Sequence, residues 1–300
     1  MSDKLLHISV CICTYKRPDL LQRLLRDLLT QETGGLFTYS IVVVDNDHAQ
    51  SAQPVVSELA SGSSVPVKYC VEPRQGIAMA RNHAVANATG EFIAFIDDDE
   101  FPIREWLLRL FSTWKQNSVD GVLGPVKPHF NADAPKWVIE GGLFDRPLHP
   151  TGLQLAWSQC RTGNVLLKRQ LFDGPTPFRP ECLNGEDQDF FKRMIEKGHS
   201  FIWCNEAVAY EVVPPARWKR SFLVRRALFR GVFSLRNYRF SPSRVLQSAI
   251  AAPAYALTLP VALLLGQAPF MRYVFKMSYH VGRLLAVVGI NPIKGQYVTD

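Results

Sequence analysis

Strand-length apolar segments that alternate with helical patterns are the feature that most limits how the first hundred residues can fold. Four segments are mostly apolar and rich in β-branched residues: residues 7–14, 40–44, 65–71 and 91–96. Leucines at helical spacing predict a helix over residues 19–30, and an alanine-rich pattern predicts another over 76–87. Apolar strands that alternate with helices are typical of a parallel sheet covered on both faces, so we expect an α/β fold.

Polar clusters follow three of these strands at the point where each strand ends. They are residues 14–17, 45–47 and 97–100. Because parallel strands end at the same edge of a sheet, we expect the three clusters to face one crevice, where open α/β sheets bind their ligands. The sequence therefore predicts a ligand site built from three loops.

The third cluster reads Asp-Asp-Asp-Glu and places four carboxyl groups in succession. Carboxylates this close repel one another unless a cation is present. Oxygen ligands suit Mg²⁺ or Mn²⁺, which commonly take one or two carboxylates and fill the other positions with water and substrate phosphates. The alternative is a solvated loop whose acids cap a helix predicted over residues 102–114.

Five motifs, together with their order and spacing, carry a resemblance to a known family. They begin at residues 13, 42, 76, 89 and 184 and read Cys-Thr-Tyr-Lys-Arg-Pro, Val-Val-Val-Asp-Asn-Asp, Gly-Ile-Ala-Met-Ala-Arg-Asn, Thr-Gly-Glu-Phe-Ile-Ala-Phe-Ile-Asp-Asp-Asp-Glu and Asn-Gly-Glu-Asp-Gln-Asp-Phe. Over residues 8–213 the chain resembles the inverting family 2 glycosyltransferases with the GT-A fold. Within that family it looks closest to the subgroup that adds glucose to lipid-linked repeats in bacterial succinoglycan-type exopolysaccharide synthesis. The resemblance implies a Rossmann-like, mostly parallel central sheet flanked by helices.

The resemblance implies a site for a UDP-sugar donor at the ends of the first two strands. Thr14, Tyr15 and Arg17 match the residues around the base and ribose, and Asp45 matches the acceptor of the uracil imide hydrogen bond. A carboxylate suits that position because uracil N3 is a donor. The alternative for Asp45 is that it caps the turn after its strand.

Two further positions are expected near the donor. Arg81 matches an arginine that lies close to the nucleotide, although it could be a surface charge on its helix. Asn164, in the pair Gly163-Asn164, matches residues near the donor sugar.

The resemblance also assigns the acidic cluster. Asp97 and Asp99 match the two ends of the family's Asp-x-Asp motif: Asp99 is expected to bind Mg²⁺ or Mn²⁺, and Asp97 to reach the ribose or the metal. Asp98 fills the variable position and is expected beside the nucleotide. Related enzymes often carry a further histidine near residue 210, but the residue there is Tyr210, so a third protein ligand is in doubt.

Asp187 and Glu186 match the family's Glu-Asp motif. Asp187 is expected to act as the general base that removes the proton of the acceptor hydroxyl, and Glu186 to place the acceptor or the base. In-line attack in a single displacement inverts the anomeric centre. The alternative is that both acids are N-terminal charges of a helix predicted over residues 187–197. Trp137 and Trp157 are candidates for stacking on acceptor sugars, or are partly buried core residues.

The last third of the chain differs sharply in charge. Residues 212–299 contain thirteen basic residues and no acidic one, so with Asp300 the tail carries +12, whereas the first 211 residues carry −5. Arginines alternate with aromatic residues over 217–244, residues 245–271 contain no charge, and an amphipathic piece follows over 271–290. The 27 uncharged residues are long enough to cross a bilayer. Because Pro253, Pro260 and Pro269 interrupt them, we keep open a kinked or re-entrant hairpin in the interface.

These patterns predict a catalytic domain over residues 1–213 and a basic, apolar helical membrane-associating region over 214–300. Such a region suits the anionic cytoplasmic face of the cell membrane, where each basic residue adds about 1 kcal/mol. It could also hold the diphosphate of a polyprenyl-diphosphate-linked glycan acceptor. The alternative is a soluble helical subdomain.

The predicted function is metal-dependent transfer of a hexose, expected to be glucose, from a UDP-sugar to a lipid-linked oligosaccharide. Arg217-Trp218 is similar to the end of the Gln-x-x-Arg-Trp motif of processive synthases, but Pro214 stands in the place of the glutamine, so we expect single-sugar transfer. One rival is a sugar-nucleotide nucleotidylyltransferase, which normally needs a glycine-rich loop after the first strand. Another is a non-enzymatic protein that binds anionic membranes or nucleic acid, but the long uncharged run does not suit a nucleic-acid surface.

The compartment is expected to be the cytosol. The first residues contain no long apolar segment followed by small residues, so we expect no secretory signal. Six cysteines without a Cys-x-x-Cys pair are interpreted as reduced thiols.

Overall fold

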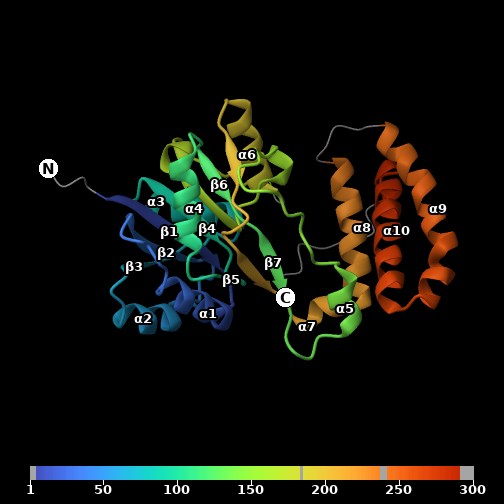
Figure 1. Cartoon of the computed structure of the whole chain (residues 1–300), viewed down its shortest axis with the longest axis horizontal. Helices are drawn as coiled ribbons and strands as arrows, with labels where there is room; N and C mark the ends of the chain where they lie inside the picture. The colour runs from blue at the N-terminus through green and yellow to red at the C-terminus, as the bar shows by residue number, and fades with distance from the viewer. Residues whose placement is uncertain (1–4, 183–184, 237–241, 291–300) are drawn as a thin grey trace. The chain divides into compact units, whose positions relative to one another are not determined.

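The computed structural model describes residues 5–182, 185–236 and 242–290 (Figure 1). The chain divides into two compact units: unit 1 comprises residues 1–127 and 146–211, and unit 2 comprises 128–145 and 212–300. The chain passes between the units three times, and the predicted boundary after residue 213 lies close to the third crossing, between residues 211 and 212. Residues 128–145, which we predicted to belong to the first domain, pack in unit 2 instead.

A seven-stranded sheet forms the centre of unit 1. Its order is β3-β2-β1-β4-β8-β6-β9. The strands are β1 (Leu6–Thr14), β2 (Phe37–Asp45), β3 (Val67–Val71), β4 (Phe92–Ile96), β6 (Gly121–Leu123), β8 (Asn164–Lys168) and β9 (Phe201–Trp203). The observed pairs are parallel except those that β8 makes with β4 and β6, which are antiparallel. The predicted, mostly parallel α/β sheet is confirmed.

Helices cover both faces of this sheet, because alternate residues of each strand point to opposite sides. Val10 of β1 packs in one core with the leucines of α1 (Pro18–Leu28) and with α4 (Trp106–Gln116). Cys11, the next residue, packs in the other core with α3 (Ile77–Asn87) and α6 (Glu186–Glu196). Each fully buried leucine contributes about 1.5–3 kcal/mol. The six cysteines are free thiols and are buried or half-buried.

A second, three-stranded sheet has the order β5-β10-β7. Its strands are β5 (Glu100–Pro102), β10 (Ala209–Val212) and β7 (Val126–His129). The predicted helix over residues 102–114 is therefore wrong at its start. Phe101 pairs with Tyr210 in β10 and the two rings stack with centroids 5.3 Å apart, so the chain stays extended through Pro102, and α4 begins only at Trp106 after a turn. The helix α2 (Gln53–Ser61) has one buried residue, Val56, and was not predicted.

Unit 2 is helical. Its helices are α5 (Lys136–Gly141), α7 (Pro215–Trp218), α8 (Arg220–Arg236), α9 (Pro242–Leu264) and α10 (Gln267–Val287). Figure 1 shows α10 between α8 and α9, and α10 packs against both. Val138 and Phe144 share a small core with Trp218 and Met271, which explains why residues 128–145 belong to this unit.

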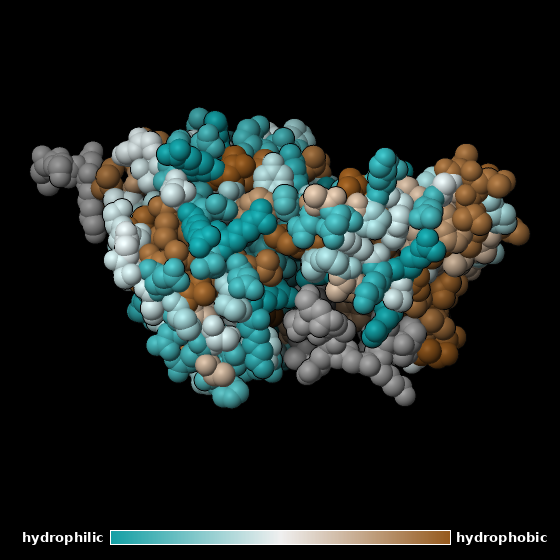
Figure 2. Space-filling model, turned by 90° about the horizontal axis from the view of Figure 1, so that it is seen from below, coloured by the Kyte–Doolittle hydropathy of each residue, from teal (hydrophilic) through white to brown (hydrophobic). Residues whose placement is uncertain are grey.

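The uncharged run over residues 245–271 is divided between two helices. Pro253 and Pro260 lie inside α9 and do not end it, so the expectation that they interrupt the run is wrong. The chain turns instead at Gly266, whose φ of 116° favours glycine, and α10 follows directly. In the described part of the chain, α9 is the one helix long and apolar enough to cross a membrane by length and composition. Figure 2 shows the hydrophobic surface of this region in brown.

Candidate active site

The carboxyl ends of β1 and β4 meet, as predicted from the polar clusters that follow them. Thr14, the last residue of β1, donates its hydroxyl hydrogen bond to Asp98 Oδ2 at 2.8 Å. Asp98 lies in the turn after β4. This contact fixes the acidic cluster against the end of the neighbouring strand.

Arg17 binds the outer side of the acidic cluster. Its Nη1 lies 3.2 Å from Asp98 Oδ1 and 3.5 Å from Asp99 Oδ2. Burial raises the pKa of the Asp98 carboxyl, while Arg17 and Thr14 oppose that shift. The structure therefore brings Thr14, Arg17, Asp98 and Asp99 together. Tyr15 lies beside them in sequence, and the Lys16 ammonium is 5.2 Å from its ring centroid.

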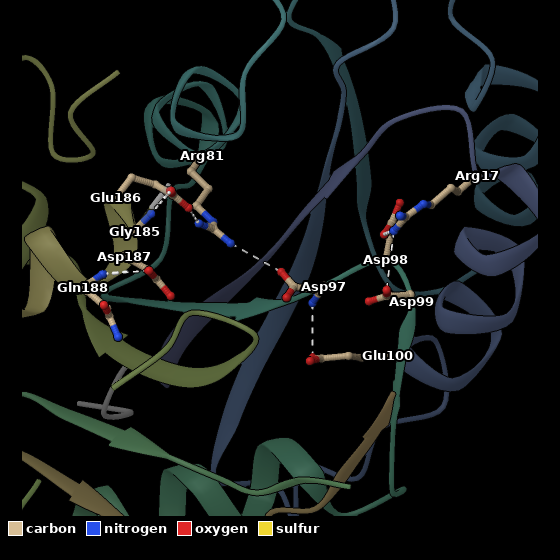
Figure 3. Close-up of polar contacts among 10 residues, drawn as sticks. All are labelled: Arg17, Arg81, Asp97, Asp98, Asp99, Glu100, Gly185, Glu186, Asp187 and Gln188. Atoms are coloured by element: carbon tan, nitrogen blue, oxygen red, sulfur yellow. Dashed lines mark hydrogen bonds and ion pairs between the residues drawn. The ribbon is translucent and has the colours of Figure 1, made fainter. Parts of the chain in front are cut away.

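Arg81 joins the acidic cluster to the Glu-Asp motif (Figure 3). It comes from α3, is 7% exposed, and forms an ion pair through Nη1 with Glu186 Oε1. Its Nη2 lies 3.5 Å from Asp97 Oδ1. Burial alone lowers the pKa of Arg81, but the carboxylates of Asp97, Glu186 and Asp187 outweigh burial and raise it. Arg81 is thus a permanently charged bridge inside the site rather than a surface charge on its helix.

The three acids in the first turn of α6 differ in their surroundings. Glu186 is buried, and burial raises the pKa of its carboxyl while Arg81 opposes the shift. Asp189 pairs with Arg193 at 2.8 Å and with Arg179 at 3.5 Å. Asp187 is half-buried, accepts the Gln188 N–H at 2.7 Å, and forms no ion pair with any described residue. Among these acids, only Asp187 combines partial exposure with a carboxylate that no cation holds.

Glu100 completes the acidic cluster from the buried side. Its Oε2 accepts the Asp97 N–H at 3.3 Å, whereas its Oε1 is buried without a hydrogen-bond partner. Burial and the nearby Asp97 raise the pKa of Glu100 well above its ordinary value. Gly163 packs against the same carboxylates, since a Cβ there would lie 2.7 Å from Glu100 Oε1 and 3.0 Å from Asp97 Oδ2.

The cluster has donors that suit a divalent cation. Three of the four carboxylates contact two arginines, Arg17 and Arg81, and one buried oxygen of the fourth, Glu100, has no hydrogen-bond partner. Over the described residues, no group of three or more histidine, cysteine or acidic side chains is arranged to hold a metal ion. The carboxylates of the cluster could supply one or two ligands to a divalent cation, with phosphate and water completing the shell.

Asp45 and Asn46 organise the loop after β2. Asp45 is fully buried; its Oδ1 accepts the Asp47 N–H at 3.0 Å, and its Oδ2 accepts the Ala52 N–H at 2.8 Å and the Tyr69 hydroxyl at 2.9 Å. These hydrogen bonds make Asp45 a cap of the turn after β2, and a hydrogen bond from uracil to this carboxylate stays a prediction.

Asn46 was missed by the sequence analysis. Its Nδ2 donates to the carbonyls of Glu72 and Arg74, and its Oδ1 accepts the Gly76 N–H at 2.8 Å. These bonds fix the start of α3 and so the base of the helix that carries Arg81. The only sequence signal was that Asn46 stands in a polar cluster after a strand.

Asn164 lies at the start of β8, where its side chain makes hydrogen bonds within the fold. Its Nδ2 donates to the carbonyls of Pro125 and Ala207 at 2.9 and 2.7 Å, and its Oδ1 accepts the Trp106 indole N–H at 2.8 Å. With its amide saturated and its side chain buried, Asn164 is a positioning residue for the sheet. The neighbouring Gly163 is the member of the pair that lies against the acidic cluster.

Comparison with known proteins decides the family. The model for glycosyl transferase family 2 matches residues 9–174. The succinoglycan biosynthesis protein ExoM of Rhizobium meliloti is 30% identical over 305 residues, which cover 98% of this chain and 97% of ExoM. The chain belongs to glycosyl transferase family 2.

Two other comparisons agree. The glycosyltransferase AglE of Haloferax volcanii is 24% identical over 220 residues, covering 72% of this chain and 70% of AglE. The crystal structure of S. aureus TarS 1–349 in complex with UDP-GlcNAc has a TM-score of 0.55 and 17% identity, covering 95% of this chain and 92% of that chain. The predicted GT-A fold and glycosyltransferase class are confirmed.

Other positions singled out from the sequence of this glycosyltransferase lie outside the ion-pair network. Trp157 is half-buried in unit 1 with Lys192 Nζ 5.8 Å from its ring centroid, and Trp137 belongs to unit 2 near Arg220. Tyr210 stacks on Phe101 in the second sheet. Trp218 is buried in unit 2, where its indole N–H donates to the Val213 carbonyl at 3.1 Å.

Proposed function

We propose that this family 2 glycosyltransferase transfers glucose from UDP-glucose to a lipid-linked oligosaccharide, with inversion and with the help of Mg²⁺ or Mn²⁺. The observation that carries the proposal is the bridge through Arg81, which holds the acidic cluster and the Glu-Asp motif within the reach of one guanidinium. The leaving diphosphate needs a cation, which acidic side chains can hold, and the attacking hydroxyl needs a base on the opposite side of the anomeric carbon.

The donor is proposed to bind where β1 and β4 end. Thr14, Tyr15 and Arg17 would contact the nucleoside, and Asp97 and Asp99 would hold the cation, with Asp98 beside the nucleotide. UDP is supported by the TarS structure solved with UDP-GlcNAc. A bound divalent cation supplies charge neutralisation for the diphosphate leaving group.

Asp187 is proposed to accept the proton of the acceptor hydroxyl. Glu186 is buried and forms an ion pair with Arg81, so it is suited to position the acceptor or the base rather than to take a proton. Asp187, half-buried and held by the Gln188 N–H, has a second oxygen for the hydroxyl. A general base of this kind contributes about 10²–10⁴-fold to the rate.

The acceptor is proposed to be a polyprenyl-diphosphate-linked glycan at the cytoplasmic face of the cell membrane, in exopolysaccharide synthesis. Support comes from ExoM, whose name places it in succinoglycan biosynthesis, and from a Campylobacter jejuni glucosyltransferase named for a polyprenyl-diphosphate glycan acceptor, which is 28% identical over 116 residues. The basic, apolar helices of unit 2 suit a membrane-borne acceptor.

The test is an assay of the purified full chain with a panel of nucleotide sugars, Mn²⁺ and a polyprenyl-diphosphate-linked oligosaccharide. We expect UDP-glucose to be used best, a β-linked product from the α-linked donor, and loss of activity on chelation. Asp187→Asn and Asp99→Asn should both be severely impaired.

Asp189→Asn is the matched control, because Asp189 lies in the same helical turn but pairs with Arg193 and Arg179. If Asp187→Asn and Asp99→Asn transfer sugar at the unmutated rate, the assignment is wrong. Release of diphosphate from UTP and glucose 1-phosphate, without sugar transfer, would establish the nucleotidylyltransferase alternative.

A further inference from the structure

The side of α9 that faces away from α10 is a continuous apolar surface. Leu246, Ile250, Leu257, Val261 and Leu264 are between 59% and 87% exposed and recur at helical spacing. We call these five residues the α9 apolar face. Single exposed apolar residues are ordinary, but a full helix face of them marks an interaction site.

The opposite side of α9 is held to α10 along its length. Ser248 and Ala252 are buried there, and Ser248 Oγ lies 3.1 Å from His280 Nδ1. Near the middle of α9, the Tyr255 ring lies with its centroid 5.5 Å from that of Tyr273. Wherever α9 lies in a bilayer, α10 therefore lies beside it.

α10 carries charges at the level of the middle of α9. Lys276 is exposed, and its Nζ lies 5.9 Å from the centroid of Tyr255. Arg283, further along, is 8% exposed and donates to Ser234 of α8 at 2.9 Å and to the Tyr279 hydroxyl at 2.7 Å. If α9 crossed the bilayer, Lys276 would lie near its midplane, where a lysine is strongly unfavourable.

α10 is in turn fixed to α8 by close packing of glycines. A Cβ at Gly282 would lie 2.9 Å from the Leu228 carbonyl carbon, and a Cβ at Gly231 would lie 2.9 Å from the Arg283 backbone nitrogen. Figure 1 shows the three helices side by side with α10 in the middle. Because α10 packs against both α8 and α9, α9 could cross a bilayer only by losing its contacts with α10 or by drawing α10 away from α8.

The backbone of α9 also suits a location at the bilayer surface. Pro253 and Pro260 have no N–H, so the carbonyls of Ala249 and Ala256 lack their helical donor. Water reaches such carbonyls at the interface but not in the hydrocarbon core. The hydroxyl of the exposed Thr258 donates to two carbonyl oxygens of the same helix, those of Ala254 and Tyr255, both at 3.0 Å.

We propose that α9 lies in the plane of an anionic bilayer with the α9 apolar face among the upper acyl chains, and does not span the membrane. The anionic partner follows from charge, since residues 212–299 have thirteen cations and no carboxylate side chain. Figure 2 shows hydrophilic side chains bordering the brown surface of this region. This inference rests on the proposed function in one respect, namely that the acceptor is linked to a lipid.

Binding is tested with vesicles of phosphatidylcholine and phosphatidylglycerol in about a 3:1 ratio, with phosphatidylcholine vesicles as the uncharged comparison. We expect binding to the mixed vesicles that falls roughly tenfold in Leu257→Glu, because a carboxylate replaces an inserted leucine. Leu148→Glu is the matched control: Leu148 is 54% exposed but belongs to unit 1, and its replacement should change binding by less than about twofold.

Depth is tested with cysteines placed one at a time at Leu246, Leu257 and Leu264, each carrying an environment-sensitive fluorophore. Lipids with nitroxides at the headgroup or mid-chain are the quenchers, and the unsubstituted protein gives the background from native cysteines. A helix in the plane gives the same ratio of shallow to deep quenching at all three positions. A ratio that shifts toward deep quenching at 257 alone indicates a span and overturns the inference.

Other outcomes are equally decisive. If Leu257→Glu binds vesicles as well as the unmutated chain, the α9 apolar face is not the docking surface. If the protein forms a dimer without lipid, and Leu257→Glu abolishes the dimer but not vesicle binding, the face belongs to a second copy. UDP-glucose hydrolysis, measured on the same variants in detergent, tests the proposed function separately and should be unchanged by Leu257→Glu.

Discussion

Two buried arginines, one in each unit, have nearly equal exposure and opposite surroundings. Arg81 in unit 1 is 7% exposed and contacts two carboxylates, Glu186 and Asp97. Arg283 in unit 2 is 8% exposed and donates to the hydroxyls of Ser234 and Tyr279. Carboxylates balance the charge of Arg81 inside the protein, whereas no carboxylate of the described residues pairs with Arg283.

The difference extends to the whole of each unit and indicates separate tasks. In unit 1, acidic side chains of the site form ion pairs with arginines, as Asp98 and Asp99 do with Arg17. The helices α7 to α10 of unit 2 contain no carboxylate side chain, so this part of unit 2 has a strong net positive charge that attracts an external anion. Chemistry is therefore expected to depend on unit 1, and attachment to an anionic surface on unit 2.

The largest effect is expected for Asp187→Asn. Loss of the proton acceptor should lower the rate of transfer by about 10³-fold and leave donor affinity and vesicle binding unchanged. Transfer kinetics, calorimetric titration with UDP-glucose and vesicle sedimentation measure the three quantities. If Asp187→Asn loses vesicle binding together with transfer, chemistry and attachment are not divided between the two units.

Arg81→Met should destabilise the protein by about 3 kcal/mol, because it leaves a buried carboxylate without its cation. Arg283→Met loses hydrogen bonds to neutral groups and should cost only about 1–2 kcal/mol. Urea denaturation of both variants measures the contrast. Adding Glu186→Gln to Arg81→Met should restore part of the stability; equal losses in the two single variants would contradict the comparison.

Lys276→Gln should weaken binding to anionic vesicles about fivefold, the effect of removing one cation at a charged surface. Its UDP-glucose hydrolysis should not change. Lys115→Gln, an exposed lysine at the end of α4 in unit 1, is the matched control and should bind vesicles normally. Equal weakening by both substitutions would mean that net charge, rather than unit 2, determines attachment.

Glu72→Gln should have the smallest effect and a defined pH dependence. The hydrogen bonds from Arg74, with help from His83, lower the pKa of Glu72 from 4.5 to about 2. A depressed carboxyl pKa stabilises the folded protein above the unfolded pKa, and this contribution is lost as the pH falls from 4.5 toward about 2.

Because Arg74 is largely exposed, we expect a difference of about 1 kcal/mol between the unmutated protein and Glu72→Gln at neutral pH. The difference should vanish as the pH approaches about 2. Denaturant titrations of both proteins across this range measure it. A difference that grows in acid would mean that Glu72 has no depressed pKa in the folded state.

Local patterns were enough to predict the elements whose signal lies within the element. The predicted strand over residues 7–14 and helix over 19–30 correspond to β1 and α1, because strand length and leucine spacing are local properties. The strand β5 was missed because Phe101 depends on Tyr210, far along the chain. The place of residues 128–145 in unit 2 depends likewise on distant partners such as Trp218.

The residues of the candidate site likewise fall into those that local motifs predict and those whose contacts depend on distant parts of the chain. Sequence motifs predicted Thr14, Arg81, Asp97 and Glu186 as site residues, and the structure places them in two adjoining groups: Thr14 with Asp98, and Arg81 with Asp97 and Glu186. The partner of Arg81 could not be predicted, because Glu186 stands 105 residues away. Asp45 shows a different limit: a carboxylate after a strand serves a turn or a ligand equally well, and only its contacts distinguish the two.

The bridge from Asp97 through Arg81 to Glu186 has a consequence for how such enzymes diversify. One buried side chain from α3 contacts both acidic motifs and so ties their separation to the position of that helix. A change in the length of the exposed loops between residues 101 and 185 is therefore expected to leave that separation unaltered.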